Sequence, residues 1–125
     1  NALTIRSLRP FPSSAVSKAL SGARRVIVFE KSLATGIGGV FSQHVRWAIG
    51  SFDTPIHSVI GGLGGRPITR PSLRRMLDKA VKGTLEENHF LDLDIDAVNA
   101  ELERQRAPGV SGGAAENLLR DIGAL

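Results

Sequence analysis

Cysteine and tyrosine are absent from this chain, and phenylalanine and tryptophan together make up 5% of its 125 residues. Without cysteine, the chain can form no internal disulfide and supply no thiolate ligand to zinc or to an iron–sulfur cluster. This composition fits a reducing cytoplasm, which is the location we expect. No apolar run approaches the ~20 residues that a membrane-spanning helix requires, and no signal-peptide pattern is present, so we expect no membrane partner.

An initiator methionine is also missing, since the chain begins Asn1-Ala2. We expect these two residues to derive from cloning and the remainder to be one domain of a longer protein; a processed mature chain is the alternative. A domain of 125 residues buries about two-thirds of the surface that its unfolded chain exposes, which is enough for a hydrophobic core.

Acidic residues are scarce in the first two-thirds of the chain. Residues 1–82 carry 13 basic and 3 acidic side chains, whereas residues 83–125 carry 3 basic and 9 acidic ones. This split indicates that the acidic end folds back on the basic body, that each end meets a different partner, or simply that two solvated surfaces differ in sign. No interleaved aromatic residues or known nucleic-acid-binding fold accompany the basic residues, so we expect no nucleic-acid partner.

Two segments share one pattern, in which a short apolar strand runs into a glycine-rich loop that opens a helix. The first comprises a strand at residues 25–30 and a helix at 40–49, and the second a strand at 56–60 and a helix from about Arg70. The loops between them contain Gly36, Gly38, Gly39, Gly62, Gly64 and Gly65. Because this is the unit of a parallel α/β sheet, we predict a three-layer α/β sandwich with a mainly parallel sheet whose first strand is covered on both faces.

Further elements are predicted before the first of these units. Residues 3–8 are compatible with a strand that the proline-containing residues 9–12 end. Ser13 or Ser14 can then cap a helix. The buried face of that helix would consist of Val16, Ala19 and Leu20.

The helix from Arg70 has the clearest amphipathic pattern in the chain. Thr69 is its natural N-cap, Pro71 lies in its first turn and Gly83 ends it. Its apolar residues recur at helical spacing and are Leu73, Met76, Leu77, Ala80 and Val81.

Beyond this helix the residues change in character. Residues 90–96 alternate apolar and acidic side chains, which favours an edge strand with one wet face. Residues 97–106 are typical of a polar helix with Val98 and Leu102 facing inward, and residues 107–113 have the composition of a linker. A last short helix would use Leu118, Leu119 and Ile122.

We therefore divide the chain into two parts. Residues 1–95 form an α/β domain, and residues 96–125 form an acidic helical extension. Neither of the two late helices would be stable without tertiary packing.

Glu30 ends the first predicted strand just before the glycine loop, where open α/β sheets often place functional side chains. No second carboxylate or histidine stands nearby in sequence to form an acid–base pair. We therefore favour an interpretation in which Glu30 hydrogen-bonds loop amides and holds the turn rigid. No Ser-His-Asp or nucleophile-elbow pattern occurs, and we predict no catalytic residue in this chain.

Neither glycine loop matches a dinucleotide-binding fingerprint or a phosphate loop, because the spacing or the following Lys-Ser/Thr is missing. Either loop could still hold an anion on bare backbone amides, so all six glycines are candidates for anion or cofactor binding. Close packing of helix on sheet, or of this domain on a neighbour, explains them better.

The densest group of basic residues is Arg66, Arg70, Arg74 and Arg75. Arginine makes planar, bidentate contacts with carboxylates and phosphates, so we interpret the group as part of an interface; a solvated helix face is the alternative. Glu30 and Trp47 are further candidates for contact with a protein partner.

The acidic residues Asp92, Asp94, Asp96 and Glu103 imitate the ligand spacing of a calcium loop. The imitation fails at Ala97, where such a loop needs glycine, and Leu93 and Ile95 alternate as strand residues do. We predict no metal site.

Three motifs occur in a specific order. Arg9-Pro-Phe-Pro12 follows the first predicted strand, Val28-Phe-Glu-Lys31 precedes Gly36-Ile-Gly-Gly39, and Gly62-Leu-Gly-Gly-Arg66 precedes Ile68-Thr69. In this order and spacing, residues 3–95 resemble the 2-oxoacid:ferredoxin (or flavodoxin) oxidoreductases. The resemblance is to the α-subunit domain that follows the pyrimidine-binding domain and is shaped like the C-terminal domain of transketolases.

The resemblance implies an enzyme that oxidatively decarboxylates pyruvate or a related 2-oxoacid to acyl-CoA. Such enzymes use thiamine diphosphate, magnesium, iron–sulfur clusters and coenzyme A, and pass electrons to ferredoxin or flavodoxin. The family's thiamine-diphosphate–magnesium motif and its cluster-binding cysteines are absent from this chain. We therefore expect a structural domain that is inactive alone, carries no cofactor and binds other domains or subunits of the oxidoreductase. The alternative is a freestanding module that binds an anion or nucleotide on its two glycine loops.

Overall fold

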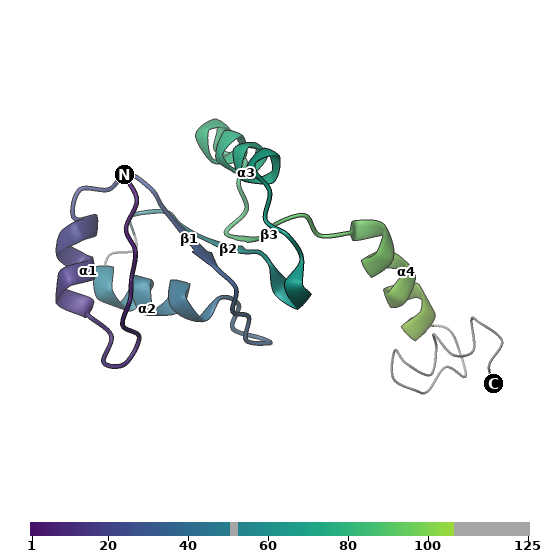
Figure 1. Cartoon of the computed structure of the whole chain (residues 1–125), viewed down its shortest axis with the longest axis horizontal. Coiled ribbons are helices and arrows are strands. Elements are labelled where there is room, and N and C mark those ends of the chain that lie inside the picture. The colour runs from purple at the N-terminus through teal and green to yellow at the C-terminus, as the bar shows by residue number, and fades with distance from the viewer. Residues whose placement is uncertain (51–52, 107–125) are drawn as a thin grey trace. The chain divides into compact units, whose positions relative to one another are not determined.

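Seven helices and strands and one short 3₁₀ turn build the part of the chain that the structure describes, residues 1–50 and 53–106 of a computed structural model (Figure 1). In chain order they are α1 (Ser13–Leu20), β1 (Val26–Glu30), α2 (Val40–Ile49), β2 (Ile56–Ile60), η1 (Leu63–Gly65), α3 (Arg70–Lys82), β3 (Asn88–Phe90) and α4 (Ile95–Arg106). All elements from α1 to β3 belong to one compact unit, Asn1–Asp92, and α4 belongs to a second.

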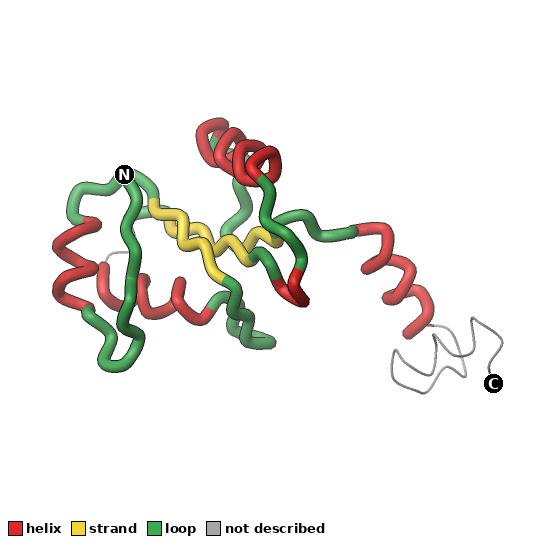
Figure 2. Tube along the Cα trace, viewed as in Figure 1, coloured by secondary structure: helices red, strands yellow, loops and turns green. Residues whose placement is uncertain are grey.

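The three strands form one parallel sheet in the order β1-β2-β3. Val26 pairs with Ile56 at one end of the β1–β2 ladder, and Glu30 pairs with Ile60 at the other. Helices α1 and α2 lie on one side of the sheet and α3 on the other (Figures 1 and 2). The predicted three-layer α/β sandwich with a parallel sheet is confirmed.

Each face of the sheet has its own hydrophobic cluster, because successive side chains of a strand point to opposite faces. The cluster under α1 and α2 contains Val16, Val26, Val45 and Ile56. The cluster under α3 contains Val59, Met76, Ala80, Leu85 and Leu91. The central strand β2 supplies residues to both clusters, and four of its five residues are buried.

The ends of α3 are the ones that the sequence predicts. The Thr69 hydroxyl accepts a hydrogen bond from the Ser72 amide (3.2 Å), Pro71 lies in the first turn, and Gly83 closes the helix in the left-handed conformation. The predicted buried face is wrong at two positions, since Leu77 and Val81 are 50% and 85% exposed. The buried row is Ser72, Met76 and Ala80. Helical periodicity shows which surface of α3 is apolar, but the three-stranded sheet covers only one side of that apolar surface.

Two predictions for the N-terminal region are wrong. Residues 3–8 form no strand, because no backbone partner pairs with them in the described part of the chain; Ile5 instead packs against the cluster of α1 and α2. Pro12, and not Ser13 or Ser14, occupies the N-cap of α1. On this helix Val16 is buried as predicted, whereas Ala19 is exposed.

The edge strand predicted at residues 90–96 is also wrong. Only Phe90 belongs to β3, which ends there. Asp92 takes a left-handed conformation (φ 54°), and the Asp94 carboxylate accepts a hydrogen bond from the Ala97 amide (3.0 Å) at the start of α4. Aspartate favours turns and helix starts because it hydrogen-bonds nearby amides, so the alternation marks a turn and a cap instead of a strand.

The helix predicted at residues 97–106 is present as α4, which begins two residues earlier, at Ile95. It has no buried residue, so Val98 and Leu102 do not face inward as predicted. The predicted linker at 107–113 and the helix with Leu118, Leu119 and Ile122 lie outside the described residues.

Candidate functional site

Glu30, the last residue of β1, is 5% exposed and has four hydrogen-bond donors around its carboxylate. The amides of Phe41 and Ser42 in the first turn of α2 donate to it at 2.8 and 3.1 Å. The hydroxyls of Ser32 and Ser58 donate at 2.6 and 3.3 Å. A helix N-terminus attracts negative charge, and here an internal carboxylate supplies it. Glu30 therefore binds backbone amides, as expected, but these amides lie in the first turn of α2 and not in the glycine loop.

Gly39 is the N-cap of α2 and lies directly against this carboxylate. A Cβ on Gly39 would overlap the Glu30 Oε1 and Ser58 Oγ atoms and would lie 2.6 Å from the Glu30 carboxyl carbon. Gly36 and Gly38 have φ angles of 80° and 92°, and paired Ala34–Gly38 backbone hydrogen bonds close the turn. The glycines of the first loop therefore let Glu30 reach the helix.

The second loop forms an exposed turn between β2 and α3. Gly62, Gly64 and Gly65 all have positive φ angles, of 74°, 63° and 77°. A Cβ on Gly62 would meet the Lys31 side chain at 2.9 Å, whereas Gly64 and Gly65 face open space. Backbone conformation explains these glycines without a ligand.

Two members of the arginine group bind Asp92, the residue that follows β3 and Leu91. Arg75 donates to the Asp92 carboxylate (2.9 Å) and to the Ser72 hydroxyl (3.1 Å), and Arg66 donates to the Asp92 carbonyl oxygen. The Ser72 hydroxyl, followed by Arg75 and Arg66, lowers the pKa of Asp92 below its usual value. This cluster joins the start of α3 to the turn after β3.

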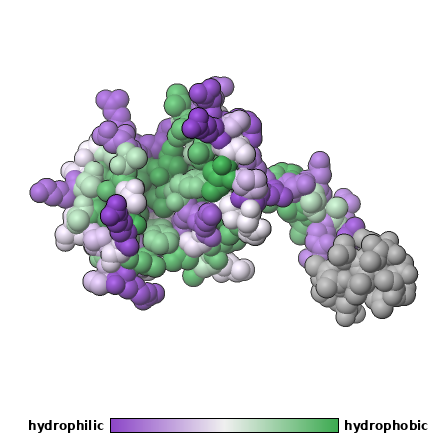
Figure 3. Space-filling view, viewed as in Figure 1, coloured by the Kyte–Doolittle hydropathy of each residue, from purple (hydrophilic) through white to green (hydrophobic). Residues whose placement is uncertain are grey.

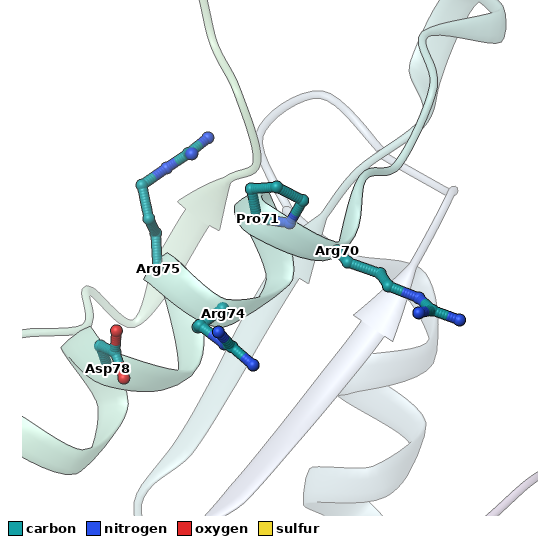
Figure 4. Close-up of a pocket in the computed structure, with 5 residues that line it drawn as sticks. All are labelled: Arg70, Pro71, Arg74, Arg75 and Asp78. Carbon is teal, nitrogen blue, oxygen red and sulfur yellow. The ribbon is translucent and has the colours of Figure 1, made fainter.

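The other two members, Arg70 and Arg74, have no hydrogen-bond or ion-pair partner among the described residues. They line a shallow hollow of about 440 Å³ together with Pro71, Arg75 and Asp78. Figure 4 shows Arg74 and Arg75 pointing to different sides of α3. Arg75 is thus engaged within the domain, whereas the side chains of Arg70 and Arg74 are not held by any group that the structure describes.

One face of α3 carries four residues that are spaced by four, three and four positions: Arg70, Arg74, Leu77 and Val81. We call Arg70, Arg74, Leu77 and Val81 the outer face of α3. Both apolar members are exposed. Figure 3 shows hydrophilic side chains beside hydrophobic ones over this helix. The amphipathic pattern of α3 predicted that Leu77 and Val81 would be buried in the core, whereas both are exposed beside the two arginines.

Trp47 on α2 is 75% exposed. Its ring lies 5.5 Å from that of His44, which in turn lies 5.2 Å from the ring of Phe11. These contacts hold the indole on the surface, on an element separate from α3. An exposed, oriented tryptophan suits a protein contact.

The described residues offer no ligand set for an iron–sulfur cluster or a metal ion. No cysteine exists to hold an iron–sulfur cluster, and within residues 1–50 and 53–106 no three His, Asp or Glu side chains gather as metal ligands. Asp92 and Asp94, the first members of the calcium-like spacing, are engaged in hydrogen bonds within the chain. Among the described helices none is long and apolar enough to cross a membrane.

Comparison with known proteins identifies the family. The family described as pyruvate:ferredoxin oxidoreductase core domain II matches residues 2–73. The chain belongs to this family. Its relatives include the protein named pyruvate synthase subunit PorA of Methanosarcina barkeri, which is 31% identical over 98 residues, covering 73% of this chain and 24% of the relative. The protein of the same name from Thermotoga maritima is 28% identical over 97 residues, with the same shares covered.

A third relative, the PorA of Methanothermobacter thermautotrophicus, is 33% identical over 67 residues, which cover 54% of this chain and 17% of the relative. The chain thus spans about a quarter of the length of the first two curated relatives. The predicted resemblance to a 2-oxoacid:ferredoxin oxidoreductase α-subunit domain is confirmed. The match includes the Glu30 site and ends within α3, at residue 73.

Proposed function

We propose that this chain is a non-catalytic assembly domain of an oxidoreductase that converts pyruvate or a related 2-oxoacid to acyl-CoA. The outer face of α3 carries the proposal. Its two arginines, which have no partner within residues 1–50 and 53–106, fit carboxylates of a partner, and the neighbouring Leu77 and Val81 offer apolar area for a protein to cover. A small anion would use the arginines and leave the apolar side chains in water.

The other interface candidates support this surface in different ways. Trp47 offers a second contact on α2. Arg66 and Arg75 position the start of α3 through Asp92, and Glu30 fixes the first turn of α2. We therefore assign direct contact to Arg70, Arg74 and Trp47, and assign to Glu30, Arg66 and Arg75 the positioning of these elements.

The name of the relatives supports pyruvate as the substrate of the parent enzyme. Magnesium and iron–sulfur clusters would bind to other parts of that enzyme, since the chain has no cysteine and its described residues contain no group of three metal-ligating side chains. We expect the same of thiamine diphosphate and coenzyme A. Ferredoxin or flavodoxin would be reached only through the complete complex. The cytoplasmic location stays a prediction.

The alternative, a freestanding anion- or nucleotide-binding module, has less support. The Glu30 carboxylate already binds two amides at the start of α2, where an anion from solution would bind. A ligand at a hundred times its dissociation constant would stabilise the fold by about 2.7 kcal/mol. We expect no such thermal shift with phosphate or adenine nucleotides.

A pull-down from lysate of the source organism tests the proposal, with this chain as bait and mass spectrometry as readout. We expect a thiamine-diphosphate-binding subunit to be recovered, together with oxidation of pyruvate dependent on coenzyme A and an electron acceptor. Recovery of the bait alone, combined with a thermal shift by adenine nucleotides, would favour the freestanding module.

A further inference from the structure

The outer face of α3 has two chemically different halves. In the first half Arg70 and Arg74 are exposed, and neither has a hydrogen-bond or ion-pair partner in the part of the chain that the structure describes. In the second half Leu77 and Val81 are 50% and 85% exposed. The four side chains form one stripe that runs along the helix for about 16 Å. A partner that covers the stripe therefore meets charge at one end and apolar area at the other.

Asp78 limits the extent of the charged half. It lines the same hollow as Arg70 and Arg74 and lies one turn beyond Arg74 (Figure 4). One carboxylate does not balance two guanidinium groups, and Arg75, the third arginine of the hollow, is already bound to Asp92. The Arg70 end therefore keeps an excess of positive charge, whereas a carboxylate placed beyond Arg74 would be repelled by Asp78. The acidic residues of a partner are thus confined to a single turn.

The spacing of the two arginines determines the spacing of the carboxylates that bind them. Arg70 and Arg74 are four residues apart, which is about 6 Å along the helix axis. A guanidinium group binds a carboxylate through two parallel hydrogen bonds, so each arginine engages its own acidic residue. The two acidic residues must then also be about 6 Å apart. Residues i and i+4 of a helix satisfy this spacing, and so do residues i and i+2 of a strand.

Backbone hydrogen bonding decides between a helix and a strand. An extended partner would bury its own amides and carbonyls against Leu77 and Val81, where α3 offers them nothing, because its backbone groups are bonded within the helix. A helical partner satisfies its backbone internally. The ridges of its side chains also fit between those of α3, as in other helix pairs. The outer face of α3 is therefore suited to a helix.

We propose that the outer face of α3 binds an amphipathic helix from another subunit of the enzyme. This helix has two carboxylates one turn apart, which pair with Arg70 and Arg74, and apolar residues further along, which cover Leu77 and Val81. The proposal rests on the proposed function, which supplies the subunit. A second copy of α3 fits the face poorly, because it offers only Asp78 to two arginines.

Photo-cross-linking during the pull-down tests the occupant directly. One bait carries p-benzoylphenylalanine in place of Val81, and the control bait carries it in place of Lys79, on another side of α3. Ultraviolet light joins the probe to the partner segment that it touches, and mass spectrometry identifies that segment. We expect the probe at position 81, and not the one at 79, to join a helical segment. That segment should have two Asp or Glu residues one turn apart and apolar residues at helical spacing beyond them.

The proposed function and this proposal fail in different ways. If neither bait recovers a subunit, the proposed function fails and this proposal fails with it. If a subunit is recovered but the probe at position 81 joins nothing, or joins a segment without the acidic pair, this proposal is overturned and the proposed function stands. A cross-link between two baits would show that a second copy occupies the face, and would also overturn the proposed partner.

Charge exchange tests the pairing with the arginines. Arg74→Glu should lower recovery of the subunit by about tenfold or more, because a carboxylate then faces a carboxylate. Replacing the facing acidic residue of the captured segment by arginine should restore recovery. If recovery stays low with both changes in place, the proposed ion pair is overturned.

Discussion

Glu30 and Gly39 are in direct contact, and the fold has no room for a side chain between them. Glu30 ends β1 and Gly39 caps α2, so their contact joins the first strand to the following helix across the glycine loop. The carboxylate takes the place at the helix start that a bound anion takes in nucleotide-binding α/β proteins. The glycine motif of the first loop is therefore explained by the packing of α2 against the end of β1, and not by a bound anion.

Replacing Gly39 tests this contact by volume. Its backbone angles (φ −70°, ψ 133°) suit alanine, so only the missing space opposes Gly39→Ala. We expect a loss of about 2 kcal/mol or more in the free energy of unfolding, measured by urea denaturation. Gly50→Ala is the control, since Gly50 has a positive φ of 63° but open space and should cost only about 1–2 kcal/mol through strain. A smaller loss for Gly39→Ala than for Gly50→Ala would contradict the account.

Replacing Glu30 by glutamine tests the same contact by charge. The amide keeps the shape but places an NH₂ group against backbone and hydroxyl donors, so Glu30→Gln should cost about 1–3 kcal/mol. The exposed Glu103→Gln should change the free energy of unfolding by less than about 0.5 kcal/mol. Equal stability of the two variants in urea would show that the Glu30 charge does not hold the helix start.

The lowered pKa of Asp92 predicts that the free energy of unfolding depends on pH. Its pKa is lowered in the fold by Ser72, Arg75 and Arg66, so its contribution is complete above the ordinary aspartate pKa of 3.8. That contribution is lost as the pH falls through the lowered value in the folded state. Asp92→Asn should therefore be less stable than the wild type at pH 7, and the difference should shrink below pH 3.8. Asparagine tolerates the left-handed backbone, so the comparison isolates the charge. A difference that is constant with pH would contradict this assignment.

Arg74 and Arg75 are neighbours in sequence but should respond differently to charge reversal. Arg75→Glu places a negative charge against the Asp92 carboxylate and should lower the melting temperature. Arg74→Glu breaks no interaction within the described residues and should leave it unchanged. Thermal unfolding followed by circular dichroism measures both. A lower melting temperature for Arg74→Glu would show that this side chain is engaged within the fold.

The sequence predicts the elements more accurately than it predicts their partners. Strands β1 and β2 and helices α2 and α3 follow from apolar periodicity and from caps such as Thr69 and Gly83, which act over a few residues. The bonds that Ser42 and Ser58 donate to Glu30 span 12 and 28 residues, so no local pattern announces them. The sequence signals of these bonds are the serines themselves: Ser42 follows the first glycine loop, and Ser58 lies in the middle of β2.

Each wrong prediction comes from a local pattern that does not determine which groups the segment meets in the fold. Exposure of Leu77 and Val81 depends on how much of α3 the sheet covers, and periodicity contains no information on sheet width. Residues 3–8 have the composition of a strand but lack a neighbour with which to pair. Asp92 and Asp94 alternate with leucines, yet they form a turn and a cap, because short polar side chains compete with the sheet for backbone amides.

The central claim is that the outer face of α3 binds another part of the oxidoreductase. Its most direct test is the pull-down repeated with the double variant Arg70→Glu and Arg74→Glu. Arg70 lies in the first turn of α3, where glutamate favours helix formation, and Arg74 has no partner among the described residues, so a loss of binding would not reflect unfolding. Lys79→Glu with Lys82→Glu, on another side of the same helix, is the matched control. We predict that the arginine variant keeps the wild-type melting temperature and loses the thiamine-diphosphate-binding subunit, whereas the lysine variant retains it. Recovery of that subunit by the arginine variant at the wild-type level would contradict the claim.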